Sequence, residues 1–112
     1  MEENQYQPDL KEIENKVTEK TKAIVLINPN NPIRSILQED TLNGIAEIAK
    51  KRNLIVISDE IYERLIYDDE KHISIASLPN MKERTITFNG FSKAYSMTGW
   101  RIGYVAAVLY KL

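Results

Sequence analysis

Residues 85–107 are TITFNGFSKAYSMTGWRIGYVAA, a segment that begins and ends in apolar residues and has a polar turn between them. The two apolar runs predict strands, and Lys93 lies just beyond the end of the first one. Ligands bind at strand ends in open α/β sheets, and a lysine held there among apolar neighbours can lose its proton and attack a carbonyl carbon. Lys93 is therefore a candidate nucleophile.

Two earlier segments, AIVLI at residues 23–27 and LIVI at residues 54–57, are continuous apolar runs typical of parallel strands buried on both faces. Between them, residues 39–52 carry apolar side chains at helical spacing and end in three cations, which complement a helix dipole. A shorter helix is predicted after Asp9, a good N-cap residue with Glu12 in the capping-box position.

The order of these elements predicts the topology. A strand, a helix and a second strand predict a right-handed parallel crossover. The link from residue 89 to residue 102 is too short for a helical crossover and favours an antiparallel fourth strand. The predicted fold class is therefore α/β, a mostly parallel sheet in a three-layer arrangement with its last strand antiparallel.

Polar side chains follow three of the predicted strands. Asn31 follows the first, Asp59 and Tyr62 follow the second, and Lys93 follows the third. If these strands are parallel, their carboxyl ends face the same crevice. A shared ligand site at this edge of the sheet is therefore predicted.

Three motifs carry a family resemblance: LINPNNP at residues 26–32, VISDEIYERLIYD at 56–68 and NGFSKAYSMTGWRIGY at 89–104. Together and in this order they resemble the pyridoxal-phosphate-dependent aminotransferases of class I/II, which have fold type I. The resemblance implies pyridoxal 5'-phosphate as cofactor and amino-group transfer between an amino acid and a 2-oxo acid. It also implies that the four strands lie side by side in the family's larger sheet.

The resemblance gives roles to individual residues. Lys93 is expected to form the Schiff base and to shuttle a proton, and Asp59 to pair with the pyridine nitrogen. Tyr62 and Asn31 are expected to donate to the phenolate oxygen. Arg101 follows Lys93 at the family's spacing for the arginine that holds the phosphate, and Ser92 is expected to add a hydroxyl there.

The chain departs from the family pattern in two places. Ile33 and Arg34 stand where members usually have Thr-Gly, and Gly90 stands where many carry a serine. Glu60, next to Asp59, is expected to point to the opposite face and to be structural. His72, in a polar DDEKH segment, is predicted to be solvated. No metal site is predicted.

Composition excludes several classes of function. The 112 residues have a formal charge of -1 and a pI near 5.9, so neither a basic surface for nucleic acid nor a polybasic membrane anchor is predicted. No apolar segment has transmembrane length. The absence of cysteine fits a cytoplasmic location.

The resemblance runs from about Gln7 to the end of the chain but covers only the middle of a family member. Residues 1–112 are therefore expected to be part of the cofactor-binding large domain, inactive alone and associated as a homodimer or higher oligomer. Other chemistry of the fold, such as a C–S β-lyase, remains an alternative. So do a non-catalytic cofactor-sensing regulatory module and a structural remnant.

Overall fold

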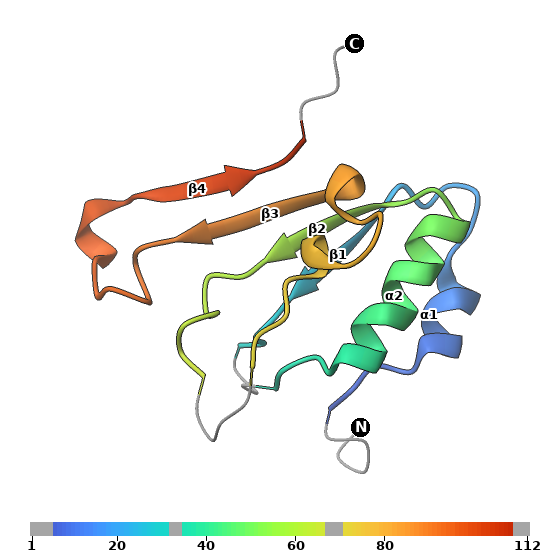
Figure 1. Cartoon of the computed structure of the whole chain (residues 1–112), viewed down its shortest axis with the longest axis horizontal. Coiled ribbons are helices and arrows are strands. Elements are labelled where there is room, and N and C mark those ends of the chain that lie inside the picture. Colours follow the sequence, from blue (N-terminus) through green and yellow to red (C-terminus); the bar gives the residue numbers. More distant parts are fainter. Residues whose placement is uncertain (1–5, 32–34, 67–70, 109–112) are drawn as a thin grey trace.

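A computed structural model of the chain describes residues 6–31, 35–66 and 71–108. These residues form one four-stranded sheet in the order β1-β2-β3-β4, with the first three strands parallel and the last antiparallel to β3 (Figure 1). The predicted α/β fold class and strand directions are confirmed. The strands are β1 (Ala23–Ile27), β2 (Ile55–Asp59), β3 (Thr85–Gly90) and β4 (Gly103–Ala106).

The ends of the later strands differ from those predicted. β2 continues to Asp59, because the ladder still pairs this residue with Ile27 of β1 and Phe88 of β3. β4 is shorter than the apolar run at residues 102–108 that predicts it, since its pairing with β3 runs only from Gly103 to Ala106. The longer β2 makes Asp59 a strand residue rather than a loop residue.

The predicted helices are confirmed as α1 (Leu10–Lys16) and α2 (Glu39–Lys51). The Oδ1 atom of Asp9 accepts hydrogen bonds from the backbone N–H groups of Lys11, at 2.8 Å, and Glu12, at 3.4 Å. Asp9 is thus the N-cap of α1, as predicted. The Glu12 carboxylate accepts a hydrogen bond from Lys16 at 2.6 Å, so it supports the helix by an i,i+4 pair.

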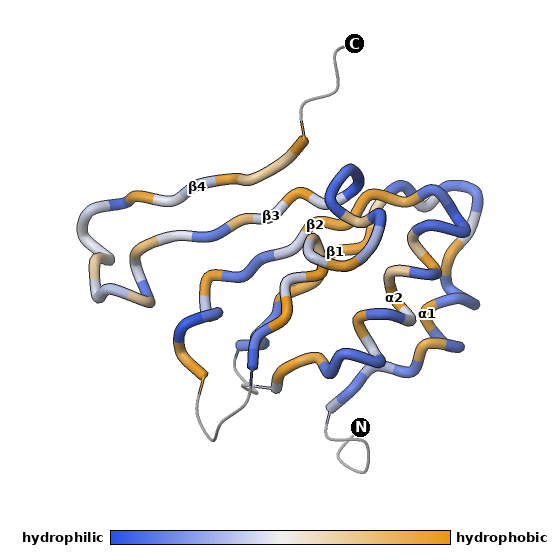
Figure 2. Tube along the Cα trace, in the orientation of Figure 1, coloured by the Kyte–Doolittle hydropathy of each residue, from blue (hydrophilic) through white to orange (hydrophobic). Residues whose placement is uncertain are grey.

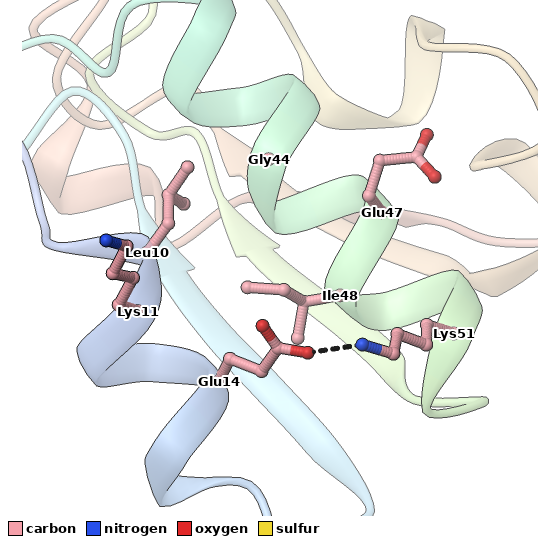
Figure 3. Close-up of a pocket in the computed structure, with 7 residues that line it drawn as sticks. All are labelled: Leu10, Lys11, Glu14, Gly44, Glu47, Ile48 and Lys51. Carbon is pink, nitrogen blue, oxygen red and sulfur yellow. Dashed lines mark hydrogen bonds and ion pairs between the residues drawn. The ribbon is translucent and has the colours of Figure 1, made fainter.

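Both helices lie on the same side of the sheet, next to β1 and β2 (Figure 1). α1 packs against α2 where Gly44 leaves room for the side chain of Leu10, and Lys51 donates to Glu14 at 2.6 Å (Figure 3). The core between the helices and the sheet contains Leu26, Leu42, Ile45, Ala46, Ala49, Leu54, Val56, Ile75 and Met81.

The opposite side of the sheet has no cover from the residues that the structure describes. Side chains alternate along a strand, so the neighbours of buried Leu26 and Val56 point away from the helices. Val25 is 65% exposed and Phe88 is 42% exposed. We call this surface the open face; it consists of Val25, Ile27, Ile55, Phe88 and Val105.

The two apolar runs therefore carry more apolar side chains than the described residues cover. Figure 2 shows the hydrophobic character of the tube along β1 and β2, yet only one of its two faces is covered within the described chain. None of the described helices is long and apolar enough to cross a membrane.

Candidate active site

Three of the predicted site residues come together beyond the ends of the strands. The Nδ2 atom of Asn31 donates to the hydroxyl of Tyr62 at 3.0 Å, and the Nζ atom of Lys93 lies 5.9 Å from the centroid of the Tyr62 ring. These residues belong to three separate turns, which follow β1, β2 and β3. Parallel pairing brings those turns to one edge of the sheet, as the sequence predicts.

Asp59 is the last residue of β2 and is half-buried. Its strand partners, Ile27 and Phe88, are apolar residues of the open face. The Oδ1 atom of Asp59 accepts from the backbone N–H of Ile61 at 3.2 Å, which fixes the carboxylate at the start of the following turn. A carboxylate with apolar neighbours is suited to face a cationic ring nitrogen.

Glu60 points to the opposite face, as predicted, and is 3% exposed. Its Oε1 atom accepts from the hydroxyls of Ser58, at 2.9 Å, and Ser74, at 2.7 Å, and its Oε2 atom lies 3.0 Å from Nε2 of His72. Burial raises the pKa of Glu60, but hydrogen bonds from His72, Ser74 and Ser58 together outweigh burial and hold that pKa below its ordinary value. Glu60 is therefore a buried, ionised carboxylate.

The prediction that His72 is solvated is wrong. Its side chain is only 10% exposed and pairs with Glu60. The polar neighbours of His72 in the sequence conceal this role, because its partner is twelve residues away in the chain. Two features of the sequence point to it: a buried Glu60 requires donors, and His72 and Ser74 alternate with Ile73 and so reach the same side.

Lys93 is exposed, which corrects the expectation of apolar neighbours around it within the described chain. Ser92 is half-buried. Arg101 is exposed, has a left-handed backbone with φ of 53°, and donates from Nη1 to the carbonyl of Thr98 at 3.2 Å. Ser92 and Arg101 thus take no part in the contacts that join Asn31, Tyr62 and Lys93. The departure at Ile33 and Arg34 lies outside the described residues.

The donor set fits pyridoxal phosphate in three respects. The cofactor needs an amine for its aldehyde, an acid for its ring nitrogen and donors for its phenolate oxygen. Lys93 offers an accessible amine and Asp59 a carboxylate. The Tyr62 hydroxyl accepts from Asn31, so its own proton remains available to another acceptor.

A second group of side chains could hold a cation. Glu60, Glu63 and His72 offer ligand atoms that lie within 4.8 Å of one another, and carboxylate with imidazole is a ligand set for zinc. Both carboxylate oxygens of Glu60 already accept hydrogen bonds, however. Nδ1 of His72, by contrast, is buried and has no hydrogen-bond partner among the described residues.

Comparisons of this chain with known proteins all identify the same family. Residues 1–109 match the sequence profile described as Aminotransferase class I and II. An aspartate aminotransferase of Pyrococcus abyssi is 57% identical over 106 residues, which are 95% of this chain and 27% of that protein. An aromatic-amino-acid aminotransferase of Thermococcus litoralis is 49% identical over 95% of this chain and 27% of its own length.

A solved structure agrees with these relatives. The crystal structure of an aromatic aminotransferase from Pyrococcus horikoshii superposes with a TM-score of 0.93 at 50% identity, over 96% of this chain and 29% of that one. The chain thus spans about a quarter of the length of the relatives it matches.

Proposed function

The chain belongs to the class I and II aminotransferases, and we propose that it forms the part of a pyridoxal-phosphate site that carries the reactive lysine. The proposed activity is transfer of an amino group between an amino acid and a 2-oxo acid. The contact of Asn31, Tyr62 and Lys93 at one edge of the sheet carries this proposal. One relative is named for aspartate and another for aromatic amino acids, so we propose a class of substrate and not a single amino acid.

Lys93 would hold the cofactor and then act on the substrate. Its exposed amine is accessible to the aldehyde, and once released it can carry a proton to or from the substrate α-carbon. When bound, pyridoxal phosphate serves as the electron sink for that carbon.

Asp59, Tyr62 and Asn31 would set the electronic state of the ring. A carboxylate facing the pyridine nitrogen favours its protonated form, which strengthens the sink. The Tyr62 hydroxyl, oriented by Asn31, would donate to the phenolate oxygen. We assign the phosphate to Arg101 and Ser92 from the family resemblance alone.

We propose further that the active protein is a homodimer or a higher oligomer. The open face and the edge strands β1 and β4, each paired on one side only within the described residues, expose apolar side chains and backbone groups that association would cover. A cytoplasmic location is also proposed, since the sequence has no cysteine.

Reductive trapping tests the site. The protein is incubated with pyridoxal phosphate, reduced with borohydride and mapped by peptide mass spectrometry. We expect the label on Lys93 and its loss in Lys93→Arg, with Lys71→Arg as the matched control. A label on another lysine, with Lys93 unmodified, would contradict the assignment.

A further inference from the structure

Asp59 and Glu60 are consecutive carboxylates with opposite surroundings. Asp59 lies on the side of the open face, and Glu60 lies on the helix side among Ser58, Ser74 and His72. Because neighbouring side chains of an extended chain point in opposite directions, fixing one of them fixes the direction of the other. The orientation of Asp59 is thus coupled to the contacts of Glu60.

The contacts of Glu60 extend to two other parts of the chain. Its backbone N–H donates to the carbonyl of Phe88 at 2.9 Å, which ties it to β3. Its side chain ties it to the segment of His72 and Ser74 at 3.0 and 2.7 Å. That segment enters the core three residues after His72, at Ile75, which is 1% exposed. The Glu60 carboxylate is therefore bonded to a segment that packs into the core.

The turn that carries Tyr62 starts from this anchor. The N–H of Glu63 donates to the carbonyl of Glu60, and the N–H of Leu65 donates to the carbonyl of Tyr62, both at 2.9 Å. If the Glu60 side chain lost its hydrogen-bond partners, the backbone carbonyl of Glu60 would no longer be held in place. Tyr62 lies two residues beyond Glu60, so its hydroxyl would move with the turn.

We propose that Glu60 and His72 form a positioning clamp that sets the orientation of Asp59 and Tyr62 toward the cofactor. The inference rests on the proposed function for its ligand, but Glu60 and His72 pair with each other on the face of the sheet opposite to Asp59. A cation bound by Glu60, Glu63 and His72 would compete with the hydrogen bonds that Glu60 accepts. All measurements are therefore made in the presence of a chelator.

Three variants separate positioning from stability. His72→Ala removes the ring and leaves the buried carboxylate short of a donor. His72→Gln returns an N–H donor at nearly the same distance from the backbone. Lys71→Ala is the matched control, because Lys71 is the exposed neighbour of His72.

Hydrogen exchange is the first measurement and needs no cofactor. In His72→Ala we expect the amides of Ile61, Glu63 and Leu65 to exchange at least about tenfold faster, the effect of a lost buried hydrogen bond to a charged group. Amides within α2 should keep their protection. His72→Gln should restore most of the protection, and Lys71→Ala should change nothing.

The spectrum of the bound cofactor is the second measurement. Tyr62 and Asn31 would stabilise the phenolate oxygen of the bound cofactor in its anionic form, so a displaced Tyr62 should raise the pH at which the visible band of the cofactor titrates. We expect this shift and about tenfold weaker cofactor binding in His72→Ala, both reversed in His72→Gln.

The two measurements separate the possible failures. Uniform loss of protection over the turn and α2 in His72→Ala, or no recovery in His72→Gln, would overturn the clamp. If the unsubstituted protein bonds no cofactor at Lys93, the proposed function fails, and the exchange data alone then decide whether His72 orders the turn.

Discussion

Asn31 and Tyr62, thirty-one residues apart in the chain, are joined by a hydrogen bond of 3.0 Å from the amide to the phenol oxygen. The contact links the turn after β1 to the turn after β2, so it exists only when the parallel ladder between these strands is correctly in register. The pair therefore reports both on the fold and on the site.

A double-mutant cycle tests whether this pair acts as a unit. We expect Asn31→Ala and Tyr62→Phe each to weaken cofactor binding, and the double variant to lose less than the sum. The coupling should be about 1 kcal/mol, as for a single hydrogen bond between neutral groups. Additive losses would show that the two residues act on the cofactor independently.

The two adjacent carboxylates should differ in their effect on turnover. Asp59→Asn should cost more activity than Glu60→Gln, because only a carboxylate keeps a ring nitrogen protonated. Glu60→Gln preserves the shape of the clamp and can still accept from Ser58 and Ser74. Steady-state rates of the two cofactor-loaded variants test this order, and equal losses of activity would contradict the different roles given to Asp59 and Glu60.

Acid should unfold the protein partly through Glu60. Its pKa is lowered in the folded chain, so the stability it contributes is complete above the ordinary pKa of a glutamate and is lost as the pH falls through the lowered pKa. Urea unfolding between pH 3 and 6, about the range of carboxyl titration, should therefore show a shallower pH dependence in Glu60→Gln. Glu19→Gln, which removes an exposed carboxylate, should follow the unsubstituted protein.

Gly44 should be intolerant of even one methyl group. A Cβ atom there would lie 2.2 Å from Cδ1 and 3.1 Å from Cγ of Leu10, so the whole side chain that docks α1 would have to move (Figure 3). Alanine gains about 1 kcal/mol of helix propensity, but overpacking costs about 1–3 kcal/mol. We expect a net loss in Gly44→Ala by thermal unfolding.

Gly99→Ala is the control for that substitution, since a Cβ atom there meets nothing within 4 Å. It should leave the melting temperature nearly unchanged. A Gly44→Ala protein that melts higher than the unsubstituted one would mean that Leu10 repacks at little cost.

The isolated chain should self-associate through its open face. Val25, 65% exposed on the edge strand β1, is a suitable position to test this. Val25→Lys should lower the apparent mass in sedimentation equilibrium, whereas Thr18→Lys adds the same charge away from the sheet and should not. A monomer at every concentration before substitution would contradict the prediction.

Local patterns in the sequence were enough to predict the strands, both helices and their directions. Asp9 capped its helix because capping is local, and Asn31, Tyr62 and Lys93 came together because parallel strands share one edge. The role of His72 was missed, since it depends on a contact with Glu60 across the fold. Ser92 and Arg101 remain predictions, because neither joins the contacts around Tyr62.

The alternation of Ser58, Asp59 and Glu60 along the end of β2 also restricts how this protein can vary in length. A one-residue insertion or deletion within Ile55–Asp59 would exchange the faces of the two carboxylates, placing Asp59 beside His72 and Glu60 on the open face. Length changes in related chains should therefore be confined to the loops on either side, and an alignment through β2 should need no gap.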